Sequence, residues 1–409
     1  MPRSEISAVT GVSVVPTRAA HSVAIVGSGP AGCYVAHFLR KHWPASEIVI
    51  FDRLDLPYGL VRYGVAPDHV GTKAVTRQFD RLFEQGGVRF LGGTEIGRHL
   101  SVDQLRAAFS VVVLATGLSA DRALDIPGSV ANGPLVGTAL AGVYGSGRLT
   151  RLINGHPDES AAGVVLGSRV AIVGQGNVAI DLVRMLLMSA DDLRGHGVPD
   201  DVVNAITAGP VRHIDVIGRS SLPRAKFDSA MIRELEKITS VRFLADPGEL
   251  DGVDSEPGDA APGDAAKRDA IVSLIEQSDQ ADVRTVRFHF GWVPEGIDGV
   301  DSVAGVMLRS TDVSRPKVRL AADSVLTAIG FLESADAPLR RQAHESHDSN
   351  LEIGRLGAGL YCVGWLRRGP QGTIPANRTD AKMVADAIVV AADTGEFAPG
   401  KPGFVGLKF

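Results

Sequence analysis

The chain has 409 residues, of which 44% are hydrophobic, and its formal net charge is −5 at pH 7. This length and composition allow two or three domains with proper cores, and the negative charge excludes a general nucleic-acid-binding surface while leaving local basic patches possible. No apolar run approaches the ~18–20 residues of a membrane span, and the two cysteines, Cys33 and Cys362, form no Cys-x-x-Cys pair.

The cysteine count favours a reducing, cytoplasmic location and argues against an iron–sulfur cluster, a zinc site or any other metal site in this chain. The first twenty residues carry Arg3 and Arg18 among scattered Ser and Thr. They lack both the long apolar core of a secretory signal and the Arg-rich helical face of a transit peptide. We therefore expect residues 1–20 to form a flexible extension.

The first folded unit begins near His21 with a strand, a glycine-rich turn and a helix. A β-branched run over 22–26 meets Gly27-Ser28-Gly29-Pro30-Ala31-Gly32, and helix-period apolar residues follow. Glycines allow the tight turn and let the backbone approach a pyrophosphate, which binds the exposed N–H groups of the helix N-terminus. The predicted cofactor contacts are Gly27, Gly29, Pro30, Ala31 and Gly32.

Two later strands add to this unit. The strand over 47–51 ends at Asp52, about twenty residues beyond the turn, where a carboxylate normally accepts hydrogen bonds from an adenosine ribose. A solvated acid after a strand is the alternative reading of Asp52. The strand over 111–114 opens onto Ala115-Thr116-Gly117, a sequence typical of two-dinucleotide flavoproteins, in which the chain passes beneath the first cofactor.

A second glycine-rich turn lies in a second unit, which begins near residue 121. The strand over 170–173 is followed by Gly174-Gln175-Gly176-Asn177-Val178-Ala179 and a helix through Arg184. The next strand closes on Gly218-Arg219-Ser220. Two such turns, one ending in Gly and one in Ala, predict two bound dinucleotides: a resident flavin at the first and a visiting nicotinamide at the second.

The remaining segments complete the second unit and return the chain to the first. Residues 250–268 are acidic and rich in Ala, Gly and Pro, which predicts a mobile surface insertion. Residues 283–309 alternate in β fashion. The strand over 324–330 is expected to return the chain to the first unit, and a strand over 360–365 precedes a helix through Asp380.

The predicted fold is therefore α/β, with two Rossmann-like dinucleotide-binding domains. Residues 21–120 and 330–409 would form a discontinuous FAD-binding domain. Residues 121–329 would form an NADP-binding domain inserted into it.

Four segments together resemble adrenodoxin reductase and its bacterial ferredoxin–NADP reductase relatives. They are 27–32, 56–69, 174–184 and 364–377. The most specific is the second, because its string Gly-Leu-Val-Arg-Tyr-Gly-Val-Ala-Pro-Asp-His is long and chemically unusual. The resemblance covers nearly the whole chain from residue 21. It implies an enzyme in which FAD accepts a hydride from NADPH and passes single electrons to a ferredoxin-type iron–sulfur protein.

The resemblance assigns a second group of residues to the flavin. Leu60 and Val61 would line its path, and Gly364 and Trp365 would lie beside the isoalloxazine, with a core aromatic as the alternative for Trp365. Backbone N–H groups of three further residues would face the pyrimidine edge of the ring, at a helix N-terminus that favours the negative charge of reduced flavin. These three residues are Gly372, Thr373 and Ile374.

Near the flavin–nicotinamide contact the resemblance places His69, Asp181 and Glu234. Asn177 and Asp181 are four residues apart and share a helix face beside the predicted nicotinamide phosphates. Direct hydride transfer needs no acid or base when the two rings are held in contact. We therefore expect His69, Asp181 and Glu234 to orient groups and balance protons, with a plain structural role as the alternative for His69.

Two departures from the family pattern concern the coenzyme. Relatives usually place two successive arginines where this chain has Arg219 and Ser220, and Met231 replaces a glutamate three residues before Glu234. One guanidinium remains, and no carboxylate of the NADH-binding kind ends the strand. The sequence predicts a preference for NADPH over NADH that is weaker than in relatives with both arginines.

The resemblance also suggests where an acidic ferredoxin would dock. Basic residues beside the cleft between the domains, and near the flavin edge, are the candidates. They are Arg224, Lys226, Arg233, Lys237, Arg367 and Arg368.

Other functions remain as alternatives. The nearest is an NAD(P)H-dependent flavin monooxygenase or peroxide-forming oxidase, although no segment marks a substrate pocket. A glutamate-synthase-like electron-input module would need cysteine clusters, which this chain lacks. A flavin-dependent structural protein would not need residues at both the flavin edge and the nicotinamide path.

Overall fold

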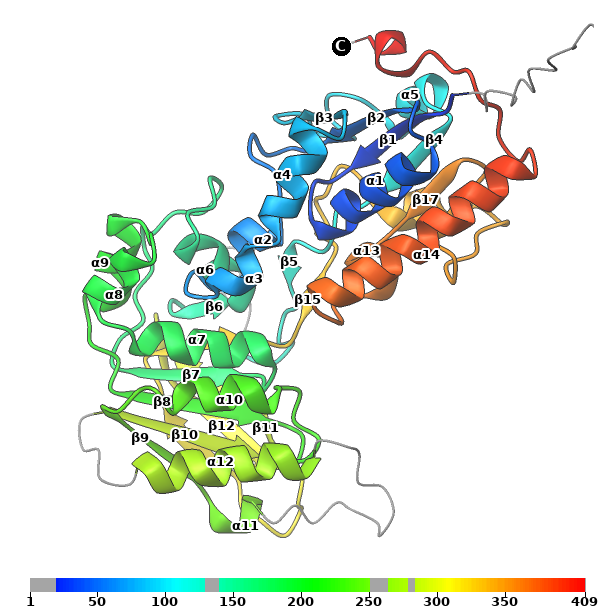
Figure 1. Ribbon diagram of the computed structural model, residues 1–409. Helices are drawn as coiled ribbons and strands as arrows, with labels where there is room; N and C mark the ends of the chain where they lie inside the picture. Colours follow the sequence, from blue (N-terminus) through cyan, green and yellow to red (C-terminus); the bar gives the residue numbers. More distant parts are fainter. Residues whose placement is uncertain (1–19, 129–139, 251–263, 279–283, 409) are drawn as a thin grey trace, which may run out of the picture.

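The computed structural model describes residues 20–128, 140–250, 264–278 and 284–408, which form two lobes, each built on its own sheet (Figure 1). Residues 1–19 of the expected extension and residues 251–263 of the expected insertion lie outside the described residues. Within the described ranges, no helix is long and apolar enough to cross a membrane.

The first lobe contains a six-stranded sheet in the order β16-β17-β4-β1-β2-β3. Its strands are β1 (Ser22–Val26), β2 (Glu47–Phe51), β3 (Val88–Leu91), β4 (Val111–Leu114), β16 (Arg355–Gly357) and β17 (Leu360–Cys362). All of them run parallel except β16, which pairs antiparallel with β17 at one edge. Every residue of β1 and β4 is buried, as expected for apolar strands covered on both faces.

Helices cover both faces of this sheet. On one face α1 (Pro30–His42), α4 (Thr76–Glu84) and α14 (Ile374–Asp393) form a common core with β1 and β2. On the other face α5 (Val102–Ala108) packs beside the C-terminal η2 (Gly403–Gly406). Four short helices occupy the connections: α2 (Leu60–Tyr63), α3 (Val70–Lys73), η1 (Arg341–His344) and α13 (Trp365–Arg368).

The second lobe contains an all-parallel six-stranded sheet in the order β6-β14-β7-β8-β10-β9. Its strands are β6 (Val143–Gly145), β7 (Arg169–Val173), β8 (His213–Gly218), β9 (Val241–Ala245), β10 (Arg284–Phe290) and β14 (Ser324–Thr327). The helices of this lobe are α6 (Ser146–Ile153), α7 (Asn177–Leu187), α8 (Ala190–Gly195), α9 (Asp200–Thr207), α10 (Ser229–Leu235), α11 (Pro247–Leu250) and α12 (Asp264–Ser278).

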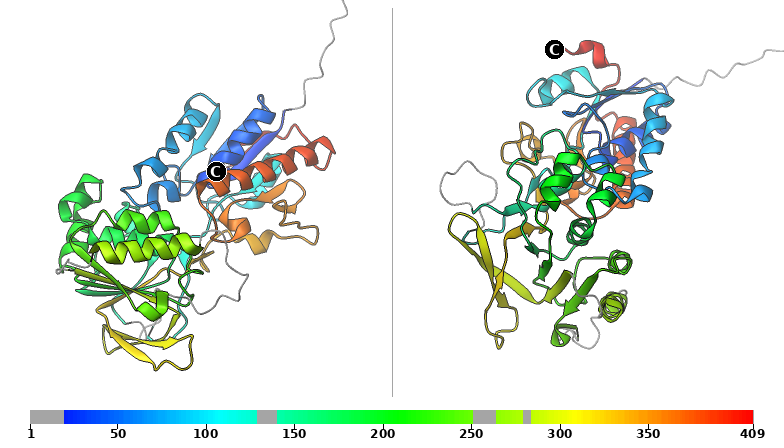
Figure 2. Two further views of the ribbon diagram at one scale, coloured as in Figure 1. Left: turned by 60° about the horizontal axis from the view of Figure 1, so that its bottom comes forward. Right: turned by 90° about the vertical axis from the view of Figure 1, so that its left-hand side faces the viewer.

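The two faces of the second sheet are covered differently. Helices α7, α10 and α12 pack on one face. A three-stranded antiparallel sheet packs on the other, formed by β11 (Trp292–Gly299), β12 (Val303–Ser310) and β13 (Val318–Ala321) (Figure 2).

A two-stranded antiparallel sheet joins the lobes. β5 (Ala120–Asp121) leaves the first lobe, and β15 (Phe331–Leu332) pairs antiparallel with it on the return. The second sheet is thus formed by a stretch of chain that interrupts the first. The predicted class, two Rossmann-like α/β units with one inserted into the other, is confirmed.

Three local expectations are wrong. The strand predicted over 324–330 does not return to the first unit, because β14 is an interior strand of the second sheet and the return is made by β15. The strand predicted over 360–365 ends at Cys362, since Gly364 has φ of +73° and Trp365 begins α13. Residues 264–268 of the expected insertion form the start of α12, because their Ala, Lys and Arg are good helix formers.

Candidate functional site

The first glycine-rich turn lies at the carboxyl edge of the first sheet, between β1 and β4. Gly27 follows β1 with φ of +107°, and a Cβ placed on it would lie 2.4 Å from the carbonyl oxygen of Ala115. Ala115 follows β4 and donates its N–H to Val26 at 2.7 Å. The strand order reverses between β1 and β4, and ligands of open α/β sheets bind at such switch points. Thr116, which is exposed, and Gly117 continue along this edge.

This turn leaves both room and hydrogen-bond donors for a diphosphate. α1 begins at Pro30, directly after Gly29, and no side chain caps its N-terminus. No described atom lies within 4 Å of a Cβ placed on Gly29, whereas a Cβ on Gly32 would lie 2.1 Å from the carbonyl oxygen of Gly27. An uncapped helix N-terminus facing open space suits an anion, so these residues fit the diphosphate of FAD.

Asp52, at the end of β2, is engaged by the turn itself. One carboxylate oxygen accepts the N–H of Ser28 at 2.8 Å and its hydroxyl, and the other accepts the N–H of Leu54 at 3.0 Å. Asp52 therefore shapes the turn. Because each carboxylate oxygen has further lone pairs, the ribose contact predicted for Asp52 stays a prediction.

The α2 segment lies against the same turn. Tyr58, with φ of +91°, donates its N–H to the carbonyl oxygen of Ser28 at 3.1 Å. A Cβ on Gly59 would lie 3.2 Å from the Cα of Gly29. Val61 is buried and Leu60 is half-buried in the first turn of α2, so the structure brings both beside the predicted FAD site.

The chain between β17 and α14 also reaches this turn. A Cβ on Gly364 would lie 2.6 Å from the Cβ of Ala31. The N–H of Gly364 donates to the buried carboxylate of Asp380 at 2.6 Å. Trp365 stacks on Phe331 with ring centroids 5.6 Å apart and an angle of 18° between the planes.

The N-terminus of α14 offers further donors beside Gly364 and Trp365. Thr373 is its N-cap residue and makes no side-chain capping hydrogen bond, and Ile374 and Pro375 form the first turn. Gly372 precedes them with φ of +82°. The indole Nε1 of Trp365 is buried without a hydrogen-bond partner in the described part of the chain. Free donors at this position fit the polar edge of a flavin ring.

The second glycine-rich turn repeats the geometry of the first. Gly174 follows β7 with φ of +125°, and a Cβ on it would lie 2.1 Å from the carbonyl oxygen of Ala328. No side chain caps α7 at Gly176. The nearest described atom to a Cβ on Gly176 is the Cβ of Lys226, at 4.0 Å. These residues fit the diphosphate of a nicotinamide coenzyme for the same reason that the first turn fits FAD.

The residues around the second turn have distinct surroundings. The side chain of Gln175 is buried and donates through Nε2 to the backbone carbonyl oxygen of His289 at 3.0 Å. The backbone carbonyl oxygen of Gln175 accepts the N–H of Lys226 at 2.9 Å. Val178 is half-buried in the first turn of α7, and Arg219 is exposed directly after β8. The carbonyl oxygen of Ser220 accepts the N–H of Gly291 at 3.1 Å.

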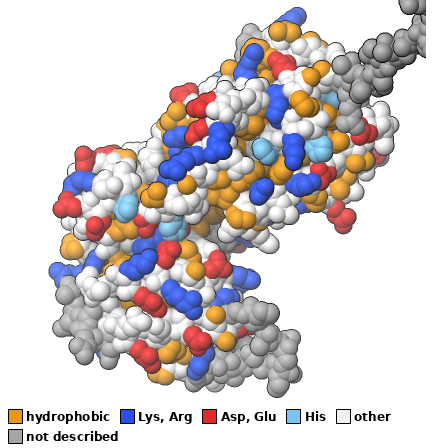
Figure 3. All heavy atoms as spheres, viewed as in Figure 1, with side chains coloured by type: hydrophobic (Ala, Val, Ile, Leu, Met, Phe, Trp, Pro, Cys, Tyr) orange, Lys and Arg blue, Asp and Glu red, His pale blue; other side chains and the backbone are white. Residues whose placement is uncertain are grey.

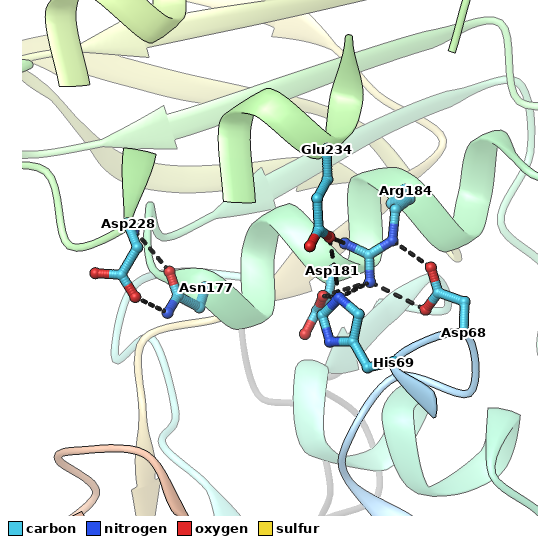
Figure 4. Close-up of polar contacts among 7 residues, drawn as sticks. All are labelled: Asp68, His69, Asn177, Asp181, Arg184, Asp228 and Glu234. Carbon is cyan, nitrogen blue, oxygen red and sulfur yellow. Dashed lines mark hydrogen bonds and ion pairs between the residues drawn. The ribbon is translucent and has the colours of Figure 1, made fainter. Parts of the chain in front are cut away.

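Asn177 and Asp181 both lie on α7, four residues apart, and their side chains have different partners. The side chain of Asn177 accepts the N–H of Asp228 at 2.8 Å and donates to its carboxylate at 2.7 Å. Asp181 instead contacts Arg184 and His69 (Figure 4). Asn177 therefore fixes the start of α10, because Asp228 is the N-cap residue of that helix.

The three predicted orienting residues do come together. Nε2 of His69 lies 3.0 Å from a carboxylate oxygen of Glu234 and 3.7 Å from one of Asp181. His69 comes from the segment between α2 and α3, Asp181 from α7 and Glu234 from α10. The cluster thus forms where the two lobes meet.

Arg184 holds this cluster together, and sequence reasoning missed it (Figure 4). It is 5% exposed and donates to Asp68, Asp181 and Glu234 at distances of 2.6–3.0 Å. An arginine within the apolar run from 182 to 187, three residues after an aspartate, was a signal that could have identified it, because an isolated charge on a buried helix face requires a partner.

The charges of the cluster shift each other's pKa. Burial would raise the pKa of Asp68, but hydrogen bonds and the charge of Arg184 lower it below its ordinary value. Burial raises the pKa of Asp181 despite the opposing effect of Arg184 and His69. The pKa of the Arg184 guanidinium is raised, because its carboxylate partners outweigh the effect of burial.

The candidate docking residues divide into two groups. Arg224, Lys226, Arg233 and Lys237 are exposed, whereas Arg367 and Arg368 are largely buried and pair with Asp380. Arg367 also donates to the carbonyl oxygen of Leu351 at 2.9 Å. The prediction that Arg367 and Arg368 present free charge to a partner is therefore wrong, since both hold the segment before α14 in place.

The two cysteines are not poised for redox chemistry. Both are buried, and burial raises the pKa of the Cys33 thiol and raises that of Cys362 to about 12. Within the described ranges, no group of three or more His, Cys, Asp or Glu residues could hold a metal ion.

Comparisons with known proteins support a cofactor site of this kind. The family model for pyridine nucleotide-disulphide oxidoreductases matches residues 21–240. Cindoxin reductase of Citrobacter braakii is 46% identical over 384 residues, which cover 93% of this chain and 80% of that protein. The mitochondrial NADPH:adrenodoxin oxidoreductase of Arabidopsis thaliana is 31% identical over 422 residues, which cover 94% of this chain and 85% of that protein.

A solved structure extends the similarity to the fold. FprA of Mycobacterium tuberculosis in complex with NADPH superposes with a TM-score of 0.80 at 26% sequence identity. The match covers 93% of this chain and 87% of that chain.

Proposed function

Because this chain belongs to the pyridine nucleotide-disulphide oxidoreductase family and to its ferredoxin–NADP(+) reductase branch, we propose that it is an FAD-dependent ferredoxin–NADP(+) reductase. It would take a hydride from NADPH and deliver single electrons to a ferredoxin-type iron–sulfur protein. The observation that carries this proposal is the pair of glycine-rich turns, each at a helix N-terminus without a side-chain cap and with room for a ligand at its second glycine.

Bound FAD supplies the chemistry that converts a two-electron donor into a one-electron donor. The residues of the first lobe would bind it. The N-terminus of α1 would hold the diphosphate, Asp52 would accept from the ribose, and Ala115 to Gly117 would lie beneath the cofactor. The N-terminus of α14 would face the polar edge of the ring and favour negative charge there.

The second lobe would bind and orient NADPH. The N-terminus of α7 would hold its diphosphate, and Arg219 would pair with the 2′-phosphate. Asp181, Glu234 and His69 would orient the nicotinamide end and exchange protons with solvent. The FAD-binding domain would comprise residues 21–120 and 330–409, and the NADP-binding domain would comprise residues 121–329. The strand orders of the two sheets support this division.

Because the net charge is −5, nucleic acid would not be among the binding partners of the protein. The two buried cysteines support a reducing, cytoplasmic location.

The proposal is tested with the purified protein under anaerobic conditions. It should be yellow and should bleach on addition of NADPH. Ferredoxin should then support reduction of cytochrome c, a haem acceptor, at a rate well above that without ferredoxin. A colourless protein would contradict the assignment of FAD. In a separate assay in aerated buffer, rapid NADPH-dependent oxygen consumption with no effect of ferredoxin would favour the flavin monooxygenase or oxidase alternative.

A further inference from the structure

A bidentate ion pair joins the two lobes at the cluster around His69. Arg184, on α7 of the second lobe, donates from Nε to Asp68 Oδ2 at 2.6 Å and from Nη2 to Asp68 Oδ1 at 3.0 Å. Asp68 lies in the segment between α2 and α3, which continues from the first lobe. Two parallel hydrogen bonds fix direction as well as distance, which a single contact does not.

The same guanidinium holds the orienting residues. Nη1 donates to Glu234 at 3.0 Å, and Nη2 donates to Asp181 at 2.7 Å. Nη2 also lies 2.8 Å from Nε2 of His69. Arg184 is thus in contact with every member of the cluster, and its five N–H groups in a rigid fork suit this number of partners.

The charge balance makes Arg184 hard to replace. Three carboxylates and one imidazole surround it, and the side chains of Asp68, Asp181 and His69 are 14%, 15% and 18% exposed. Removing the guanidinium would leave these carboxylates close together and uncompensated, which is costly for partly buried charges. Other polar contacts also join the lobes: Lys73 Nζ donates to Asn154 Oδ1 at 2.6 Å, and Arg53 pairs with Asp158. Each is a single hydrogen bond, which fixes the relative direction of the lobes less well than the bidentate pair does.

We propose that Arg184 is a positioning residue for hydride transfer: its pair with Asp68 sets how the second dinucleotide turn lies relative to the first, and its other contacts hold His69 at the junction. This inference rests on the proposed function. A misplacement of about 1 Å between reacting groups can cost on the order of 100-fold in rate. Loss of the clamp should therefore slow the transfer step much more than it weakens NADPH binding.

The first experiment measures flavin reduction by NADPH in a rapid-mixing instrument. Arg184→Met and Asp68→Asn should each slow this step by about 10- to 100-fold, with a larger primary isotope effect from deuterated NADPH. Arg184→Lys should recover only part of the rate, because an ammonium cannot form the bidentate pair. The matched control is Arg355→Met, which removes an arginine paired with Glu396 inside the first lobe and should leave the rate unchanged.

The second experiment measures the distance between the lobes without using activity. Cys33 and Cys362 are buried, so spin labels can be directed to Val390→Cys on α14 and Val300→Cys beside β11, where the native valines are 62% and 92% exposed. Arg184→Met and Asp68→Asn should shift or broaden the distance distribution, whereas Arg355→Met should not.

An unchanged distance distribution together with a reduction rate within about twofold of the native protein would overturn the inference. If Arg184→Met does not fold, Asp68→Asn decides alone, because it removes the charge at nearly constant shape. If the native protein holds no flavin that NADPH reduces, the proposed function fails, whereas the distance measurement still tests the clamp.

Discussion

Gly27 and Ala115 lie so close together that a Cβ on Gly27 would approach the carbonyl oxygen of Ala115 to 2.4 Å. Gly27 also has φ of +107°, which side chains rarely adopt. Gly29, two residues later, has an ordinary φ of −66° and open space where its Cβ would be. The two glycines of one turn are therefore required for different reasons, folding at Gly27 and ligand access at Gly29.

This difference predicts opposite outcomes for two similar substitutions. Gly29→Val should fold, with a native circular dichroism spectrum, but its FAD content per chain should fall several-fold because the valine side chain would occupy the diphosphate position. Gly27→Val should fail to fold or should be severely destabilised. Normal flavin content in Gly29→Val would contradict the placement of FAD at this turn.

Coenzyme preference provides the second prediction. A charge-assisted contact to a phosphate contributes roughly 1.5–3 kcal/mol, which is about ten- to a hundredfold in kcat/KM. Arg219→Ala should raise KM for NADPH and leave NADH kinetics nearly unchanged, and Ser220→Arg should increase the preference for NADPH. Native protein that uses NADH better than NADPH would show that Arg219 does not bind the 2′-phosphate.

Much of this site could be predicted from local sequence, because a glycine-rich turn needs only a strand before it and a helix after it. The bounds of β2 at Glu47 and Phe51 and the start of α7 at Asn177 follow from such local patterns. The contact of His69 with Glu234, 165 residues later in the chain, could be expected only from the resemblance to a known family. Periodicity and spacing alone do not indicate it.

The sequence did not reveal the side chains that hold the candidate site residues in place. Arg184 and Asp380 are buried charges whose partners come from distant segments, and a local pattern cannot identify such partners. The same limitation made Arg367 and Arg368 look like free surface charges. Both arginines pair with the carboxylate of Asp380, which lies in the second turn of α14.

The third prediction concerns the pH dependence of stability. His156 is 5% exposed, its ring packs edge-on against Tyr63, and burial lowers its pKa to about 4. The pKa of a histidine in an unfolded chain is ~6.5. Near and below that pH the unfolded state therefore binds more protons than the folded state. The free energy of unfolding should therefore decrease as the pH falls from about 6.5 towards 4, as linkage requires.

Replacing His156 should remove this dependence. His156→Gln should be less stable than the native protein at pH 7.5, because the ring contact is lost, but its stability should decrease less between pH 7 and pH 5. Denaturant titrations at several pH values measure this, with His347→Gln, at a side chain 91% exposed, as the control. If the free energy of unfolding decreased equally with falling pH in the native protein and in His156→Gln, another group would control the loss of stability at acid pH.

The last prediction concerns docking of the electron acceptor. Figure 3 shows a notch between the two lobes, on the side away from α8 and α9. The net charge of −5 would repel an acidic ferredoxin, so attraction has to come from a local group of cations. Arg233 and Lys237 remain candidates because they are exposed on and just after α10, the helix that carries Glu234.

Association that is steered by charge weakens as salt screens it, over a Debye length of ~10 Å at 0.1 M. Ferredoxin-dependent reduction of cytochrome c should therefore decrease steeply with ionic strength, and Arg233→Glu with Lys237→Glu should slow it at low salt. Ferricyanide reduction by the same double variant should be nearly unchanged, because ferricyanide needs no docking surface. Arg367→Glu should instead impair both assays and lower flavin content, since Arg367 supports Asp380 and the segment before α14. If the double variant at α10 also lost both activities equally, the damage would lie in the fold or the flavin site, and docking at α10 would have to be abandoned.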